Sequence, residues 1–214
     1  MRPIKAAFLL MLSLLLLSGP AAAAKHKIEF PSSDADRIIK VDLLPKNPVK
    51  KPVVQNKQNE ARVEAIVDLF TRTNPKLARK RAAEYAEYII QAAEKFGQDP
   101  FVIASMIVHE STVRYDAVSK GGDYGLMQVR WSVHKKKISK KYPHIKTAKD
   151  VLDPKYNILI GTEIFASYRA SAGSDLRRGL LGYSAGNKKL ADKIFSTKQG
   201  LEKTYQKLLS TGKK

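Results

Sequence analysis

The fold is decided by the stretch Phe101–Trp131, which reads FVIASMIVHESTVRYDAVSKGGDYGLMQVRW. Asp99-Pro100 precedes it and favours the start of a helix, because Asp can accept hydrogen bonds from free N–H groups and Pro fits the first helical position. Within Phe101–Val108 only Ser105 is polar. A helix that is apolar nearly all round is usually buried, so we expect this helix to be buried.

Glu110 follows this apolar segment, in an unusual position for a carboxylate. It is expected beside buried side chains and near a helix C-terminus, where the helix dipole is negative. Both effects raise the pKa of a carboxyl group. A Glu that stays protonated near neutral pH can act as a general acid. The alternative interpretation is a solvated helix-end carboxylate that only borders the core.

Several short motifs follow in order. They are Glu110-Ser111, Ser119-x-x-Gly122, Gly125-Leu126-Met127-Gln128, Asn157-Ile158-x-x-Gly161 and Tyr183-Ser184-Ala185-Gly186. Together they resemble the signature of the soluble lytic transglycosylase (SLT) family, over roughly residues 78–196. Glu-Ser or GLMQ alone would be a weak signal, whereas the two at this separation are specific.

The resemblance implies a mainly α, lysozyme-like helical domain that acts on peptidoglycan glycan strands and needs no cofactor. The implied reaction breaks the β-1,4 bond between N-acetylmuramic acid and N-acetylglucosamine and leaves a 1,6-anhydro ring on the muramic acid. In this scheme Glu110 is the catalytic residue, acting first as acid and then as base. The same family scheme has Tyr183 hydrogen-bond Glu110 and orient it.

The resemblance also implies a set of substrate-binding residues. Gln128 would bind the glycan or its N-acetyl group, and Met127 would line the cleft. Ser111 would position groups near the reacting sugar. Ser119 and Ser184 lie in the matching loop and turn and complete the set.

Three departures from the family pattern affect the details. Ser184 replaces the usual Asn of the last turn, Asp123 stands where a small residue is usual, and the stretch after Trp131 is rich in lysine. Asp123 matters most, because a second carboxylate can position a water. Two alternatives therefore stay open: a hydrolytic muramidase of the same fold, and a non-catalytic wall-binding or assembly protein.

The N-terminus predicts export. Residues 1–24 combine Arg2 and Lys5, a short apolar run and an Ala-rich end, which is the pattern of a cleaved signal peptide. An uncleaved anchor is the alternative, but the run is short for a membrane span. The sequence contains no Cys, which excludes a lipid-modified cysteine. We expect the protein in the periplasm or cell-wall space, not lipid-anchored.

The formal net charge of +19 predicts a polyanionic partner. Export makes nucleic acid an unexpected partner, while peripheral electrostatic contact with anionic envelope polymers is compatible with the charge. Residues 25–59 are basic and Pro-punctuated and read as a flexible tether, before a domain over residues 60–210. We expect a monomer.

Apolar spacing predicts the helices of this domain and no strands. They are expected over residues 61–72, 77–96, 101–110, 150–170, 176–183, 189–196 and 201–209. The stretch Trp131–Lys149 holds seven lysines. It is interpreted either as a basic rim of the substrate cleft or as a solvated surface loop.

Two rival motifs fail. His109-Glu110 begins like the zinc motif H-E-x-x-H, but residue 113 is Val. The segment Gly182–Gly186 matches G-x-S-x-G, but a helix is expected before it and every His lies upstream of Ser184. His134 and His144 lack a third ligand nearby in the sequence, so no metal site is expected.

Overall fold

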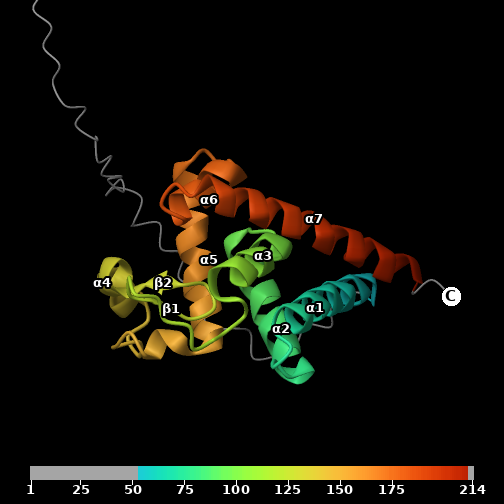
Figure 1. Cartoon of the computed structure of the whole chain (residues 1–214), viewed down its shortest axis with the longest axis horizontal. Helices are drawn as coiled ribbons and strands as arrows, with labels where there is room; N and C mark the ends of the chain where they lie inside the picture. The colour runs from blue at the N-terminus through green and yellow to red at the C-terminus, as the bar shows by residue number, and fades with distance from the viewer. Residues whose placement is uncertain (1–52, 212–214) are drawn as a thin grey trace, which may run out of the picture. The chain divides into compact units, whose positions relative to one another are not determined.

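The computed structural model describes residues 53–211, with side chains from residue 57. The predicted signal peptide and most of the predicted tether lie outside these residues. The described part is mainly helical, as predicted (Figure 1). The elements are α1 (Val53–Thr73), α2 (Arg79–Phe96), α3 (Pro100–Ser111), β1 (Asp123–Tyr124), β2 (Val129–Arg130), α4 (Trp131–Lys141), the 3-10 turn η1 (Asp150–Leu152), α5 (Pro154–Ser171), α6 (Leu176–Tyr183) and α7 (Lys188–Thr211).

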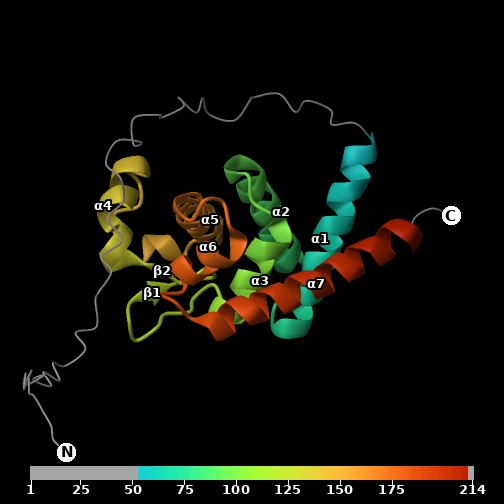
Figure 2. The ribbon, with the colours of Figure 1, turned by 90° about the horizontal axis from the view of Figure 1, so that it is seen from above.

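Helix α3 lies at the centre of the fold, as its composition predicts. The Asp99 side chain accepts a hydrogen bond of 2.8 Å from the backbone N–H of Phe101 and caps the helix. Every residue from Phe101 to Ile107 is at most 5% exposed. Helices α1, α2 and α7 pack around it, and Figure 2 shows α7 crossing α3 on its way to α1.

Two element boundaries differ from the prediction. Helix α1 begins at Val53, inside the range assigned to the tether. Helix α7 is continuous through Gly200, whereas two helices were expected over residues 189–196 and 201–209. Its apolar face packs against α3 and α1 on both sides of Gly200, and this packing outweighs the low helix propensity of glycine.

The expectation of no strands was wrong. Strands β1 and β2 pair antiparallel, with Asp123 opposite Arg130 and Tyr124 opposite Val129. Two-residue strands are too short to show an apolar alternation, so the sequence carries no periodic signal for them.

The lysine-rich stretch is also different from a loop. Residues 131–141 form α4, which is held by Ile138, 3% exposed. Tyr142 and Ile145 follow it into a second apolar cluster against Ile160 and Ile164 of α5. No helix among residues 53–211 is long and apolar enough to cross a membrane.

Helix α5 fixes the loop between β1 and β2. Asn157 is fully buried; its Oδ1 accepts from the Met127 N–H at 2.8 Å, and its Nδ2 donates to the carbonyls of Tyr124 and Val151 at 2.8 and 2.9 Å. Gly125 has a φ of 76° and lies against the Asn157 amide, where a side chain would not fit. One turn along α5, Gly161 leaves space for the Met127 side chain.

Gly161→Ala is predicted to destabilise the fold by about 1–3 kcal/mol, because overpacking a filled core forces neighbours apart. Its Cβ would lie 2.6 Å from Met127 Sδ and 2.7 Å from Met127 Cβ. Urea unfolding followed by circular dichroism measures the change.

Gly200→Ala is the matched control, since a Cβ at this position would meet no atom within 4 Å. Replacing an open helical glycine should stabilise by about 0.5–1 kcal/mol. Equal effects of the two substitutions would contradict the assigned role of Gly161.

Candidate active site

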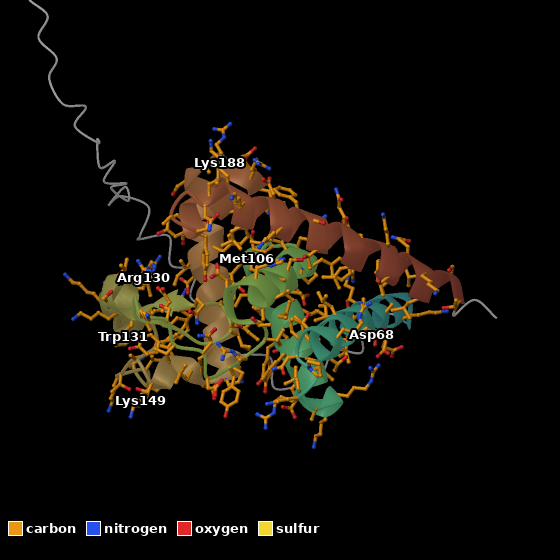
Figure 3. The ribbon with its side chains drawn as sticks, in the orientation of Figure 1. Asp68, Met106, Arg130, Trp131, Lys149 and Lys188 are labelled. Carbon is orange, nitrogen blue, oxygen red and sulfur yellow. The ribbon has the colours of Figure 1, made fainter. Side chains whose placement is uncertain are left out.

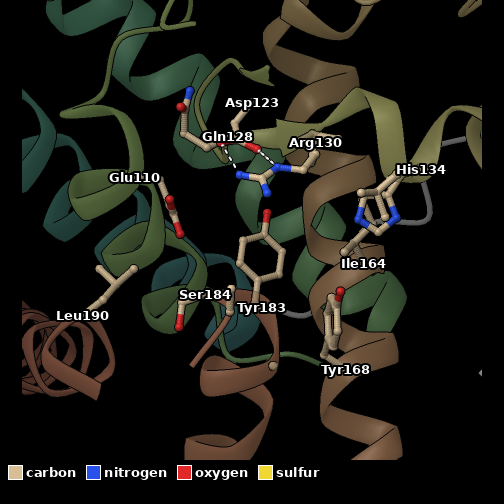
Figure 4. Close-up of a pocket in the computed structure, with 14 residues that line it drawn as sticks. Glu110, Asp123, Gln128, Arg130, His134, Ile164, Tyr168, Tyr183, Ser184 and Leu190 are labelled. Carbon is tan, nitrogen blue, oxygen red and sulfur yellow. Dashed lines mark hydrogen bonds and ion pairs between the residues drawn. The ribbon is translucent and has the colours of Figure 1, made fainter. Parts of the chain in front are cut away.

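A cavity of about 280 Å³ opens at the C-terminal end of α3 (Figure 4). Its walls come from α3, the β-ribbon (β1, β2 and the loop between them), the first turn of α4, α5, the end of α6 with the turn after it, and the start of α7. The lining residues are Glu110, Asp123, Gln128, Val129, Arg130, Val133, His134, Ile164, Tyr168, Gly182, Tyr183, Ser184, Ala185 and Leu190.

Glu110 lies in the last turn of α3, at the boundary between core and cavity. Burial, and secondarily the negative charge of Asp123, raise its pKa from 4.5 to about 7. No described residue donates a hydrogen bond that would stabilise its charged form. The carboxyl group is therefore divided between its protonated and ionised forms near neutral pH, so it can both give and take a proton.

The backbone immediately after Glu110 is strained. Thr112 and Val113 have φ values of 55° and 57°, in the left-handed region that β-branched residues seldom occupy. Val113 is only 1% exposed, and its carbonyl accepts from the Asn74 side chain at 3.2 Å. This packing ends α3 directly after Ser111 and so keeps Glu110 in the last helical turn. Such strain is typical of functional sites.

Asp123 lies in the same cavity but is held as a carboxylate. Arg130 donates from Nε to Oδ1 at 2.6 Å and from Nη2 to Oδ2 at 2.9 Å. The Ser119 hydroxyl donates to Oδ2 at 2.8 Å. The hydrogen bond from Arg130 lowers the pKa of Asp123, and the one from Ser119 adds to the effect. The pKa of Glu110 is thus raised and the pKa of Asp123 lowered. Such a difference between two neighbouring carboxyl groups allows one to act as an acid while the other stays charged.

Gln128 presents an acceptor to the cavity. Its φ of 49° places it in the left-handed region, and its Nε2 donates to the carbonyls of Gly125 and Ala117 at 2.9 and 3.2 Å. Both amide N–H groups are therefore used by the protein. The carbonyl oxygen Oε1 remains to accept from a ligand N–H or O–H group.

Tyr183 was expected to hydrogen-bond Glu110, but it hydrogen-bonds the loop between β1 and β2. Its hydroxyl donates to the Met127 carbonyl at 2.7 Å, and a hydroxyl has only one proton to donate. Phe165 and Tyr168 hold the ring by edge contacts, both with centroids 6.2 Å away. Burial, and next the charge of Glu110, raise the pKa of Tyr183, so the hydroxyl stays neutral and keeps its lone pairs as acceptors.

Three of the expected site residues lie outside the cavity lining. The Met127 side chain is fully buried and packs on Gly161, so it does not line the cleft. Ser111 is 3% exposed and donates to the Ile107 carbonyl. Ser119 acts on Asp123, as described. Ser184 does line the cavity, with its hydroxyl turned to the Leu180 carbonyl at 2.8 Å.

Arg130, His134 and Tyr168 also line the cavity and were not predicted as site residues. Arg130 and His134 follow GLMQ by two and six positions, so their closeness to that motif was the available signal. Burial, followed by the charges of Lys137 and Arg130, lowers the pKa of His134. Among residues 53–211 no group of three His, Asp or Glu side chains is arranged to hold a metal ion.

The comparison with known proteins gives one family. The family model of the transglycosylase SLT domain matches residues 87–206, more than half of the 214-residue chain. The match includes every cavity residue and the motifs that resemble the family signature.

The raised pKa of Glu110 predicts a pH-dependent stability. Below pH 4.5 the carboxyl is protonated in both folded and unfolded chains, and it contributes no difference. As pH rises towards 7 the unfolded chain ionises first, so the folded state loses stability by about 2–3 kcal/mol. Glu110→Gln should therefore match the wild type at pH 4 and exceed its unfolding free energy at pH 8.

Urea unfolding at both pH values measures this difference. Glu87→Gln, at an exposed position of α2, is the control and should change stability by less than about 0.5 kcal/mol. The same stability difference for Glu110→Gln at pH 4 and pH 8 would show that Glu110 titrates as in the unfolded chain.

Proposed function

Because this chain belongs to the SLT transglycosylase family, we propose that it is a lytic transglycosylase which cleaves the bond between N-acetylmuramic acid and N-acetylglucosamine. Membership gives it a peptidoglycan-acting function of the transglycosylase and lysozyme kind. One observation supports the proposed transglycosylase reaction above all. Glu110 has a pKa of about 7 and shares its cavity with the ionised Asp123.

The proposed reaction uses Glu110 twice. Its proton passes to the glycosidic oxygen as the bond from that oxygen to C1 of the muramic acid breaks. The resulting positive charge on the sugar is shared with its own N-acetyl group. The C6 hydroxyl then bonds to C1 and returns its proton to Glu110. No water is consumed, and Glu110 ends protonated, ready for the next cycle.

Other cavity residues support this scheme. The ionised Asp123 stabilises positive charge at the sugar ring. Gln128 offers Oε1 to the substrate acetamido N–H, which is the role expected from the resemblance. Tyr183 acts as a positioning residue, because it joins α6 to the Met127 carbonyl and so fixes the backbone of the neighbouring Gln128.

A muramidase of the same fold is the second candidate, and Asp123 is the observation that favours it. An anhydro product is favoured most strongly when no second carboxylate faces the cleft, yet Asp123 lines the cavity. A hydrolase needs a second carboxylate as base or nucleophile. Against this, Arg130 engages both oxygens of Asp123 and lowers its pKa, which makes it a weak base. We therefore favour the C6 hydroxyl as the nucleophile, which has the entropic advantage of an intramolecular group.

The site of action is proposed from the N-terminal pattern together with the family. An exported protein of this kind meets peptidoglycan in the periplasm or cell-wall space. The presence of Glu110, Gln128 and Tyr183 in one cavity supports a catalyst over a non-catalytic wall-binding protein.

Glu110→Gln is predicted to abolish wall-lysing activity while the protein stays folded. Gln is nearly isosteric with Glu but can neither give nor take the proton. Release of soluble fragments from purified sacculi measures the activity, with Glu87→Gln as the matched control that should retain it. Residual activity above a few per cent would place the acid elsewhere.

The products are predicted to carry 1,6-anhydromuramic ends. Mass spectrometry should find them lighter by one water than hydrolysed fragments, and borohydride should not reduce their muramic ends. Hydrated, reducible ends would favour the muramidase. In that case Asp123→Asn should remove the hydrolytic product, whereas in a transglycosylase it should slow the reaction and leave the anhydro product unchanged.

A further inference from the structure

Helix α4 carries unpaired positive charge. Lys135, Lys136, Lys137 and Lys140, named here the lysine rim, are all exposed. None of the ion pairs within residues 57–211 includes one of them. Lys141 is different: it contacts Glu163 at 2.7 Å and lies over the Phe96 ring, so it serves the packing of α4.

The other basic helices of the described chain have acidic partners on themselves or on a neighbouring helix, although some lysines of α7 are in no ion pair. Arg79 of α2 pairs with Asp68 of α1 at 3.1 Å. Arg177 of α6 pairs with Asp192 of α7 at 2.6 Å. Helix α4, by contrast, contains five lysines and no acidic residue, and Figure 3 shows nitrogen-tipped side chains projecting from it, next to the labelled Arg130 and Trp131.

The lysine rim works against the helix that carries it. Lys136 and Lys140 lie four residues apart, and like charges at this spacing destabilise a helix. Ile138 is the one buried residue of α4, so little packing offsets the repulsion. An anionic ligand bound to these lysines would relieve their mutual repulsion, so we expect the surface to bind anions.

The lysine rim adjoins the cavity directly. Val133 and His134 of the first turn of α4 line the cavity, and the rim begins at the next residue. Lys140 lies about 10 Å further along the helix axis, which is close to the screening length of about 8 Å at physiological salt. Burial lowers the pKa of His134, and Lys137 lowers it further, so the field of the rim reaches into the cavity.

The cavity itself has a small net charge. Asp123 stays ionised, but its charge and that of Arg130 sum to zero, and Glu110 is partly protonated near pH 7. This division of charge matches the chemistry of a peptide-bearing glycan strand. The sugar backbone is neutral, whereas each peptide stem carries free carboxylates a short distance from the muramic ring.

We propose that the lysine rim binds the free carboxylates of the peptide stems on the strand whose sugars occupy the cavity. This makes peptide-bearing glycan, and not peptide-free glycan, the preferred substrate. The inference rests on the proposed function. The adjacency of the rim to the cavity favours a ligand attached to the glycan over a separate anionic wall polymer. Lysine, a hydrated point charge on a flexible stem, suits carboxylates that vary in position.

The test is a binding measurement in the Glu110→Gln background, where the strands are not cut. The rim variant carries Lys135→Gln, Lys136→Gln, Lys137→Gln and Lys140→Gln. The control removes the same charge far from α4 through Lys76→Gln, Lys80→Gln, Lys203→Gln and Lys207→Gln, all at exposed positions. Ligands are soluble native strands, the same strands with amidated carboxylates, and peptide-free strands.

The rim variant should bind native strands about ten- to twentyfold more weakly, since each of the four lost ion pairs contributes roughly a twofold effect. The control should bind them like the parent. On amidated and peptide-free strands the rim variant and the parent should be equal. Circular dichroism checks that α4 stays folded, which is expected because the substitutions remove repulsion.

Two outcomes would overturn the proposal. One is an equal loss of affinity for native strands in the rim and control variants, which would show that only the net charge of the protein matters. The other is an equally large loss of affinity of the rim variant for peptide-free strands, or strong competition by a free phosphodiester polymer. Either result would show that the lysine rim binds another ligand. Failure of the proposed function is separate: it would appear as no cutting of any strand by the wild type, while this binding comparison could still succeed.

Discussion

The apolar helix α3 must be covered on every side, and this requirement organises the structure. Helices α1, α2 and α7 supply the cover, and Leu190 near the start of α7 lines the cavity next to the last turn of α3. Glu110 lies in that turn, where one side of its carboxyl faces the core and the other faces the cavity. Its raised pKa results mainly from burial, so the packing that stabilises the domain also keeps this carboxyl partly protonated near neutral pH.

The loop from Gly125 to Gln128 has a structural and a chemical part. Leu126 and Met127 are fully buried, and Gly125 lies against Asn157 where a side chain would not fit. Only Gln128 turns towards the cavity. The contacts of Asn157 and Tyr183 with the backbone of this loop fix it to α5 and α6, and they determine where β1 and β2 place Asp123 and Arg130. The GLMQ motif is thus largely a set of packing constraints around one side-chain amide that faces the cavity.

The sequence predicted those parts of the fold that depend on neighbouring residues, such as helix caps and apolar segments. The capped, apolar α3 and the family of the domain followed from the sequence. So did the burial of Glu110 and its raised pKa, because the carboxylate follows a buried segment. The errors arose where distant contacts decide. Helix α4 is formed by Ile138 packing on α5 in spite of its lysines, and the Met127 side chain lies in the core because Gly161, more than thirty residues away, leaves space for it. The direction of the Tyr183 hydroxyl likewise depends on where the ribbon lies.

The Asp123–Arg130 pair has a further consequence for Glu110. Two carboxylates in one cavity compete, and an uncompensated neighbour would raise the pKa of Glu110 further. Arg130 holds the charge of Asp123 through two hydrogen bonds and offsets part of its field, so burial remains the larger cause of the shift at Glu110. A pKa near 7 favours a group that must both give and take a proton in one cycle, because neither form is strongly disfavoured. Arg130 therefore lets the cavity contain the ionised Asp123 while the pKa of Glu110 stays near 7, as the proposed reaction requires.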